Sequence, residues 1–181
     1  MYDRVFIGGP SQAGKTTLAR KIAALTGYAP VQMDTDWLML RTTRIRFDAP
    51  RDFLRRQRGQ ALVRRIPSAT VVEGHLVTPT FLASRAQDAP TLLPIFLGYP
   101  DADTERKIAM IRDSGLRPYL LNKGAAWLHN WIDRNKRESA DLRDACAARG
   151  IRFIDLSDGD AMDDIQTRVA QDIAAQLAPP K

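Results

Sequence analysis

The feature that most constrains this chain is an octapeptide near its N-terminus, Gly-Pro-Ser-Gln-Ala-Gly-Lys-Thr at residues 9–16. It fits the pattern G-x-x-x-x-G-K-[ST], in which glycines let the backbone curl so that successive N–H groups converge on phosphate oxygens. An apolar run at residues 5–7 precedes it, and residues of helical spacing follow it, namely Leu18, Ile22 and Leu25. A strand, a glycine turn and a helix N-terminus are the context that this pattern requires. The octapeptide, called the P-loop below, predicts binding of a nucleoside triphosphate.

Individual roles follow from the chemistry of the P-loop. We expect the Lys15 ammonium near the β- and γ-phosphates as a catalytic charge, and the Thr16 hydroxyl on Mg²⁺. The nucleotide-binding residues predicted here are Gly9, Ser11, Gln12, Ala13, Gly14, Lys15, Thr16 and Thr17.

Apolar runs and helical patterns alternate along the chain. We expect strands at residues 5–7, 29–33, 70–72, 92–97 and 151–156, and helices after the P-loop and at about 51–65, 103–115 and 161–177. Such alternation predicts a parallel sheet with right-handed crossovers, which is a three-layer α/β fold. We expect one domain over residues 1–181, with helices on both faces of the sheet.

Composition narrows the environment and the partners. The chain has no apolar run near the roughly eighteen residues of a membrane span, and its start leaves no room for a signal peptide. Its single cysteine, Cys146, suits a reducing compartment and is expected to fill the core, so we predict a cytoplasmic protein without a membrane partner. The net charge of +6 favours anionic partners, and seven arginines gather between residues 41 and 58.

Two carboxylates end the second expected strand, Asp34 and Asp36. Residues separated by one position share a side of a strand, and ligands of α/β folds bind at the carboxyl end of the sheet. We assign Asp36 to the hydroxyl of the acceptor substrate, as a catalytic and substrate-binding group, and Asp34 to the metal side through water. The order of these two roles stays open, as does a simple turn-capping role.

The substrate side has further candidates. Glu73 and Gly74 end the third expected strand, where Glu73 either supports the metal or contacts the acceptor, and Gly74 permits close approach. Arg41 and Arg44 are candidate ligands of an anionic acceptor, in a substrate-binding region at about 36–66.

A polar stretch at residues 133–138 interrupts a helical pattern between residues 122 and 150. We interpret it as part of a lid at about 117–139, in which Arg134 and Arg137 stabilise charge on the transferred phosphoryl group. Lys123 and Arg117 are weaker alternatives, and a solvated helix face explains the same charges. The loop at residues 155–160 either contacts the nucleotide base or caps the last helix.

In these residues the chain resembles the small-molecule kinase branch of P-loop proteins, which includes shikimate kinase, gluconate kinase, nucleoside monophosphate kinases and chloramphenicol phosphotransferase. The resemblance rests on residues 9–16, on Asp34-Thr35-Asp36 and on Val72-Glu73-Gly74. The segment at 96–103 is similar to uncharacterised bacterial kinases related to 2-phosphoglycerate kinase. The resemblance implies the P-loop NTPase fold with strand order 2-3-1-4-5, the use of ATP and Mg²⁺, a substrate-binding region after the second strand and a lid before the last.

We therefore predict an ATP-dependent kinase that transfers the γ-phosphoryl group to a small, anionic metabolite. Two alternatives remain at this point. The basic charge also suits a nucleic-acid end kinase, and a P-loop alone also suits a nucleotide-gated binding or regulatory protein without an acceptor.

Overall fold

The computed structural model describes residues 1–33, 66–75, 77–86, 90–114, 120 and 122–180. Several predictions fall outside these ranges: the helix at 51–65, nearly all of the substrate-binding region, and the side chains of Asp34, Asp36, Arg41, Arg44 and Arg117.

Five parallel strands form the sheet, in the order β2-β3-β1-β4-β5. They are β1 (Arg4–Gly8), β2 (Ala29–Gln32), β3 (Thr70–Glu73), β4 (Leu92–Gly98) and β5 (Arg152–Asp155). The central strands β1, β3 and β4 are buried almost throughout, as expected for apolar runs covered on both faces. The predicted fold class and strand order are confirmed.

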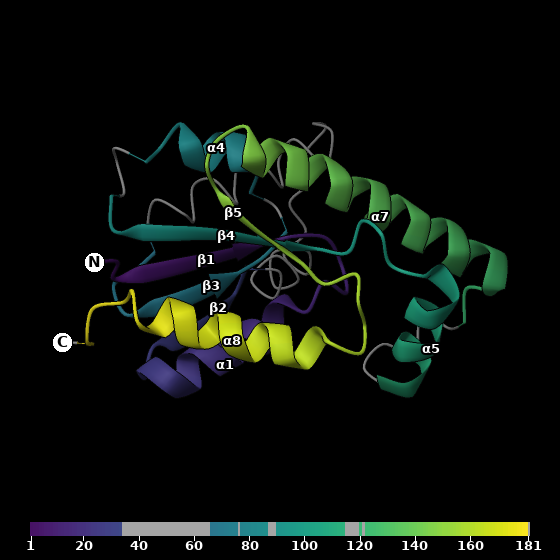
Figure 1. Ribbon diagram of the computed structural model, residues 1–181, viewed down its shortest axis with the longest axis horizontal. Helices are drawn as coiled ribbons and strands as arrows, with labels where there is room; N and C mark the ends of the chain where they lie inside the picture. The colour runs from purple at the N-terminus through teal and green to yellow at the C-terminus, as the bar shows by residue number, and fades with distance from the viewer. Residues whose placement is uncertain (34–65, 76, 87–89, 115–119, 121, 181) are drawn as a thin grey trace, which may run out of the picture.

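Helices form a layer on each side of this sheet. Figure 1 shows α1 and α8 against one face, α4 and α7 against the other, and α5 beyond the carboxyl ends of the strands. Their bounds are α1 (Lys15–Thr26), α4 (Pro79–Ala83), α5 (Thr104–Ser114), α7 (Ala125–Ala147) and α8 (Met162–Ala174). The molecule is therefore a three-layer α/β structure whose strands all direct their carboxyl ends toward α5.

The core has two parts because successive residues of a strand face opposite sides. Val5 and Ile7 of β1 pack with the α1 and α8 side chains, whereas Phe6 packs on the other face with Phe96 and Cys146. The Phe6 and Phe96 ring centroids are 6.0 Å apart. Burial of each such side chain contributes about 1.5–3 kcal/mol to the stability of the fold. Cys146 fills the core as predicted.

The polar stretch at 133–138 does not interrupt the helix, and this part of the sequence interpretation is wrong. Helix α7 runs continuously from Ala125 to Ala147. Two buried polar side chains of α7 donate hydrogen bonds to backbone carbonyls one turn earlier. Asn135 Nδ2 donates to the Trp131 carbonyl at 2.7 Å, and Ser139 Oγ donates to the Asn135 carbonyl at 2.8 Å. Polar side chains can therefore occupy the buried face without ending the helix.

Candidate functional site

The P-loop connects the carboxyl end of β1 to the first turn of α1, where Thr17 also lies. Gly9 has φ 138° and Gly14 has φ 76°, values that side chains disfavour, and a Cβ at Gly9 would collide with the Leu97 carbonyl. Gln12 also lies in the left-handed region, at φ 62°. Turns that combine ordinary and left-handed residues can direct backbone N–H groups toward an anion, so the backbone of this loop suits phosphate.

The start of α1 adds to this geometry. Its N-cap is Gly14, no side chain caps it, and its first turn carries no acidic residue. An α-helix leaves its first N–H groups without intrahelical partners and carries a partial positive charge there. The N-terminus of α1 is thus suited to an anion from outside the protein.

Lys15 folds back over the loop. Its side chain is buried, with 8% of the residue exposed, and Nζ donates to the Pro10 carbonyl at 2.8 Å. A carbonyl inside the loop thus holds the ammonium close to the N–H groups that face the concavity.

Thr16 and Glu73 meet at the same edge. Thr16 Oγ1 donates to Glu73 Oε1 at 2.8 Å, and Gln32 Nε2 approaches Thr16 Oγ1 at 3.5 Å. The sheet register explains the meeting, because Glu73 is paired with Ile7 of β1 on one side and with Gln32 of β2 on the other. Of the two roles left open for Glu73, this contact favours the metal side.

Gly74 follows directly, and its N–H donates to the Ile7 carbonyl at 3.1 Å. A Cβ at this position would lie 3.0 Å from Met33 Cβ, so glycine allows the end of β2 to close on β3. The predicted substrate-binding residues Glu73 and Gly74 therefore lie beside the P-loop, while Arg41, Arg44 and Asp36 lie outside the described residues.

The donor set at Thr16 suits Mg²⁺. A hydroxyl and a carboxylate are hard oxygen ligands, and Mg²⁺ is usually held by one or two such groups together with phosphates and water. The described residues contain no group of three or more His, Cys, Asp or Glu side chains arranged for a metal. Thr16 and Glu73 therefore fit a metal that arrives with the nucleotide phosphates rather than one held by a protein cage.

Two distant side chains bind the outer surface of the P-loop, and sequence analysis missed both. Tyr99 Oη donates to the Ser11 carbonyl at 2.7 Å, and Gln166 Nε2 of α8 donates to the Gly14 carbonyl at 3.1 Å. Tyr99 is fully buried, and burial, together with the negative charge of Glu138, raises the pKa of its hydroxyl. The hydroxyl is therefore a permanent hydrogen-bond donor.

Lys107 of α5 was missed as well. Its Nζ lies 4.3 Å from the centroid of the Tyr99 ring, and only 6% of the residue is exposed. Burial lowers the pKa of Lys107 to about 8. A lysine next to the apolar positions Ile108 and Ile111 is the sequence signal that would have drawn attention to it.

Arg134 and Arg137 lie on the exposed side of α7. The buried side of the helix carries Leu128, Ile132 and Ser139, and neither arginine forms an ion pair with a residue that the structure describes. Lys123 is exposed just before the helix. Both side chains are therefore exposed on α7, and their role over the transferred phosphoryl group stays a prediction.

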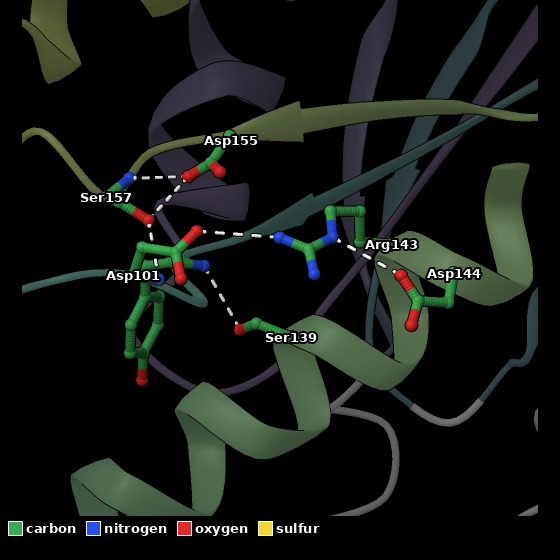
Figure 2. Close-up of polar contacts among 7 residues, drawn as sticks. Asp101, Ser139, Arg143, Asp144, Asp155 and Ser157 are labelled. Carbon is green, nitrogen blue, oxygen red and sulfur yellow. Dashed lines mark hydrogen bonds and ion pairs between the residues drawn. The ribbon is translucent and has the colours of Figure 1, made fainter.

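Figure 2 shows the polar network behind the loop after β5. Asp155 Oδ1 accepts hydrogen bonds from Ser157 N and Oγ, and Ser157 Oγ accepts one from the Asp101 N–H at 3.0 Å. Arg143 of α7 pairs with Asp101 at 3.5 Å. Asp158 Oδ1 accepts the Asp160 N–H. The acids of this loop mainly accept hydrogen bonds from the loop's own backbone. The N-cap of α8 is Ala161 and no side chain caps the helix, so the prediction that the loop caps the last helix is wrong.

Solved structures of kinases share this fold along nearly the whole chain. Shikimate kinase from Bacteroides thetaiotaomicron is 18% identical, with 94% of this chain and 97% of that chain covered and a TM-score of 0.62. A gluconokinase from Sinorhizobium meliloti is 14% identical, with 97% of each chain covered and a TM-score of 0.57. Shikimate kinase from Acinetobacter baumannii, solved in complex with shikimate, is 17% identical, with 98% and 97% covered and a TM-score of 0.56.

By sequence, no protein-family model and no curated protein matches the chain. At these identities the neighbours define the fold, which is the shikimate kinase-like P-loop fold, and at that level the resemblance to small-molecule kinases is confirmed. No helix among the described residues is both long and apolar enough to cross a membrane.

Proposed function

We propose that this protein is an ATP-dependent kinase that transfers the γ-phosphoryl group to a small, anionic metabolite. The observation that carries the proposal is the assembly of Lys15, Thr16 and Glu73 around an uncapped helix N-terminus at the carboxyl edge of the sheet. The kinase folds of the structural neighbours support it.

Phosphate binding begins with the backbone. The N–H groups of the loop and of the first α1 turn bind β- and γ-phosphate oxygens, and Lys15 exchanges the Pro10 carbonyl for phosphate. Because Lys15 lies in a buried setting, its charge acts through a lower effective dielectric than in water. It stabilises the negative charge that spreads over the transferred phosphoryl oxygens.

Thr16 and Glu73 are the described residues that would hold Mg²⁺ beside the phosphates, with Asp34 joining them through water. The ion, when bound, neutralises charge on the β- and γ-phosphates. Thr16 would offer a lone pair of its hydroxyl oxygen to the ion and would still donate its proton to Glu73, so Glu73 would orient the hydroxyl toward the metal site.

The acceptor half of the site rests on residues predicted from sequence. Asp36 orients the acceptor hydroxyl, and Arg41 and Arg44 bind its negative group. Arg134 and Arg137 complete the site if the region at about 117–139 moves over the nucleotide as a lid. A neighbour of this fold holds a small molecule, shikimate, which supports a small acceptor here.

The test is an ADP-release screen of hydroxylated, anionic metabolites with Mg·ATP, followed by Lys15→Ala. We expect kcat/KM to fall by about a hundredfold or more, because the charge acts on the transition state. Lys21→Ala, which removes a lysine of the same helix paired with Asp163 instead, is the matched control and should leave turnover unchanged. Turnover by Lys15→Ala close to that of the unmodified protein would refute the proposal.

A further inference from the structure

The peptide between Ser11 and Gln12 has a fixed direction. Its carbonyl accepts the Tyr99 hydroxyl at 2.7 Å. Because a trans peptide is planar, with N–H and C=O antiparallel, the Gln12 N–H must point the opposite way, away from Tyr99. Tyr99 is fully buried in the protein, so the Gln12 N–H is directed toward the concave side of the loop, opposite the surface that Tyr99 binds.

We propose that Tyr99 is a positioning residue for the phosphate site, whose hydroxyl holds the Ser11–Gln12 peptide so that the Gln12 N–H binds phosphate. This inference rests on the proposed function, in which the P-loop binds a nucleotide. Tyr99 itself does not touch the nucleotide and acts through the backbone of the loop.

The loop needs such a support because Gln12 has φ 62°. A residue with a Cβ pays about 1–2 kcal/mol in the left-handed region. Rotation of the Ser11–Gln12 peptide would relieve that cost and would turn the N–H away from the phosphate. The hydrogen bond from Tyr99 opposes this rotation, since the rotated carbonyl would leave a buried hydroxyl without an acceptor.

Tyr99 is itself held from two further elements. Its N–H donates to Ser139 Oγ of α7 at 3.1 Å, and the Lys107 ammonium of α5 lies over its ring. A cation over the ring face draws electron density from the phenol, which makes the hydroxyl a stronger donor. Lys107 is thus a second positioning residue, acting through Tyr99.

The test compares two tyrosines with the same bond. Tyr28 is also buried, and its hydroxyl donates to the Ala178 carbonyl at 2.7 Å, at the far end of α1 from the P-loop. Tyr99→Phe and Tyr28→Phe therefore delete the same group from the same kind of contact. The probes are ADP and inorganic pyrophosphate, with affinities measured by calorimetry and folding checked by thermal unfolding.

We expect Tyr99→Phe to lower the affinity for both probes by about ten- to a hundredfold, which corresponds to the loss of one hydrogen bond to a charged group. Tyr28→Phe should stay within about twofold, although both variants lose similar stability. A second measurement repeats Tyr99→Phe in a Gln12→Gly background, where the left-handed conformation at residue 12 no longer costs free energy. We expect the loss of probe affinity caused by Tyr99→Phe to be several-fold smaller there than in the unmodified protein. Lys107→Met keeps the Tyr99 hydroxyl, and we expect it to lower the affinity for both probes by about two- to fivefold. This variant replaces Tyr99→Phe in the test if Tyr99→Phe does not fold.

Equal affinities of Tyr99→Phe and Tyr28→Phe would overturn the inference while leaving the proposed function intact. Failure of the unmodified protein to bind either probe would overturn both, because the loop would then bind no phosphate. An undiminished effect of Tyr99→Phe in the Gln12→Gly background would also overturn it, since the effect would not pass through the peptide.

Discussion

Glu73 is the residue whose role the structure sharpens most. On sequence grounds it belonged either to the metal or to the acceptor, and its contact with Thr16 Oγ1 favours the metal. The carboxylate is buried, with 5% of the residue exposed, so its charge is best compensated by a bound cation.

Glu73→Gln keeps the shape and the hydrogen bond to Thr16 but removes the charge. We expect the Mg²⁺ concentration needed for half-maximal ATP binding to rise by about tenfold, because one charged oxygen ligand is lost. Titration of Mg²⁺ at fixed ATP, followed by calorimetry, measures this.

Glu105→Gln is the matched control, since Glu105 is exposed and pairs with His129 away from the P-loop. An unchanged Mg²⁺ requirement in Glu73→Gln, with a raised KM for the acceptor, would return Glu73 to the acceptor side.

Sequence patterns located the elements better than the contacts between them. Each strand was predicted to within one residue. The central strands β1, β3 and β4 were clearest, because a strand covered on both faces is a continuous apolar run. The prediction for α7 was wrong because Asn135 and Ser139 bond to the preceding turn, which a polarity pattern does not reveal.

The candidate site divides in the same way. The P-loop was found because its residues are contiguous. Tyr99 and Gln166 were missed because they reach it from 88 and 152 positions away in the sequence. The roles of Asp34, Asp36, Arg41 and Arg44, which lie outside the described residues, stay predictions.

Helix α5 carries an unfavourable buried charge, the ammonium of Lys107. Burial lowers the pKa of Lys107 from 10.5 to about 8, so the native state bears the full cost of the charge below about pH 8. Between pH 8 and pH 10.5 Lys107 is protonated in the unfolded chain but has released its proton in the native state, so the free energy of unfolding rises with pH.

Lys107→Met should therefore be more stable than the unmodified protein at pH 7, by about 1–2 kcal/mol after allowing for the lost contact with the Tyr99 ring. The difference should shrink toward pH 10. Urea unfolding of both proteins from pH 7 to 10 measures it, and a difference independent of pH would show that Lys107 is not strained by its charge. The raised pKa of Tyr99 keeps its hydroxyl protonated over this pH range.

At the scale of the molecule, parallel strands bring groups from β1, β2 and β3 to one edge. A binding protein and a kinase both need the phosphate half of that edge, and only a kinase needs an acceptor half. Asp36→Asn distinguishes the kinase from the binding protein, because it changes a predicted acceptor residue and none of the P-loop residues.

We expect Asp36→Asn to lower kcat by about a hundredfold or more, within the range of general-base contributions, with the Kd for ATP within about twofold. Turnover and ATP calorimetry on the same preparation give both numbers. Unchanged ATP hydrolysis without any acceptor-dependent turnover in either protein would favour the nucleotide-gated binding protein.

The contact between Gln166 and Gly14 also has a consequence for synthesis. The P-loop leaves the ribosome among the first residues, whereas α8 is made about 150 residues later. Until α8 packs against α1, the Gly14 carbonyl lacks its outer donor, and the Gln166 side chain that borders Gly14 is absent. A nascent chain therefore carries the P-loop sequence long before Gln166 of the last helix can hold the Gly14 carbonyl.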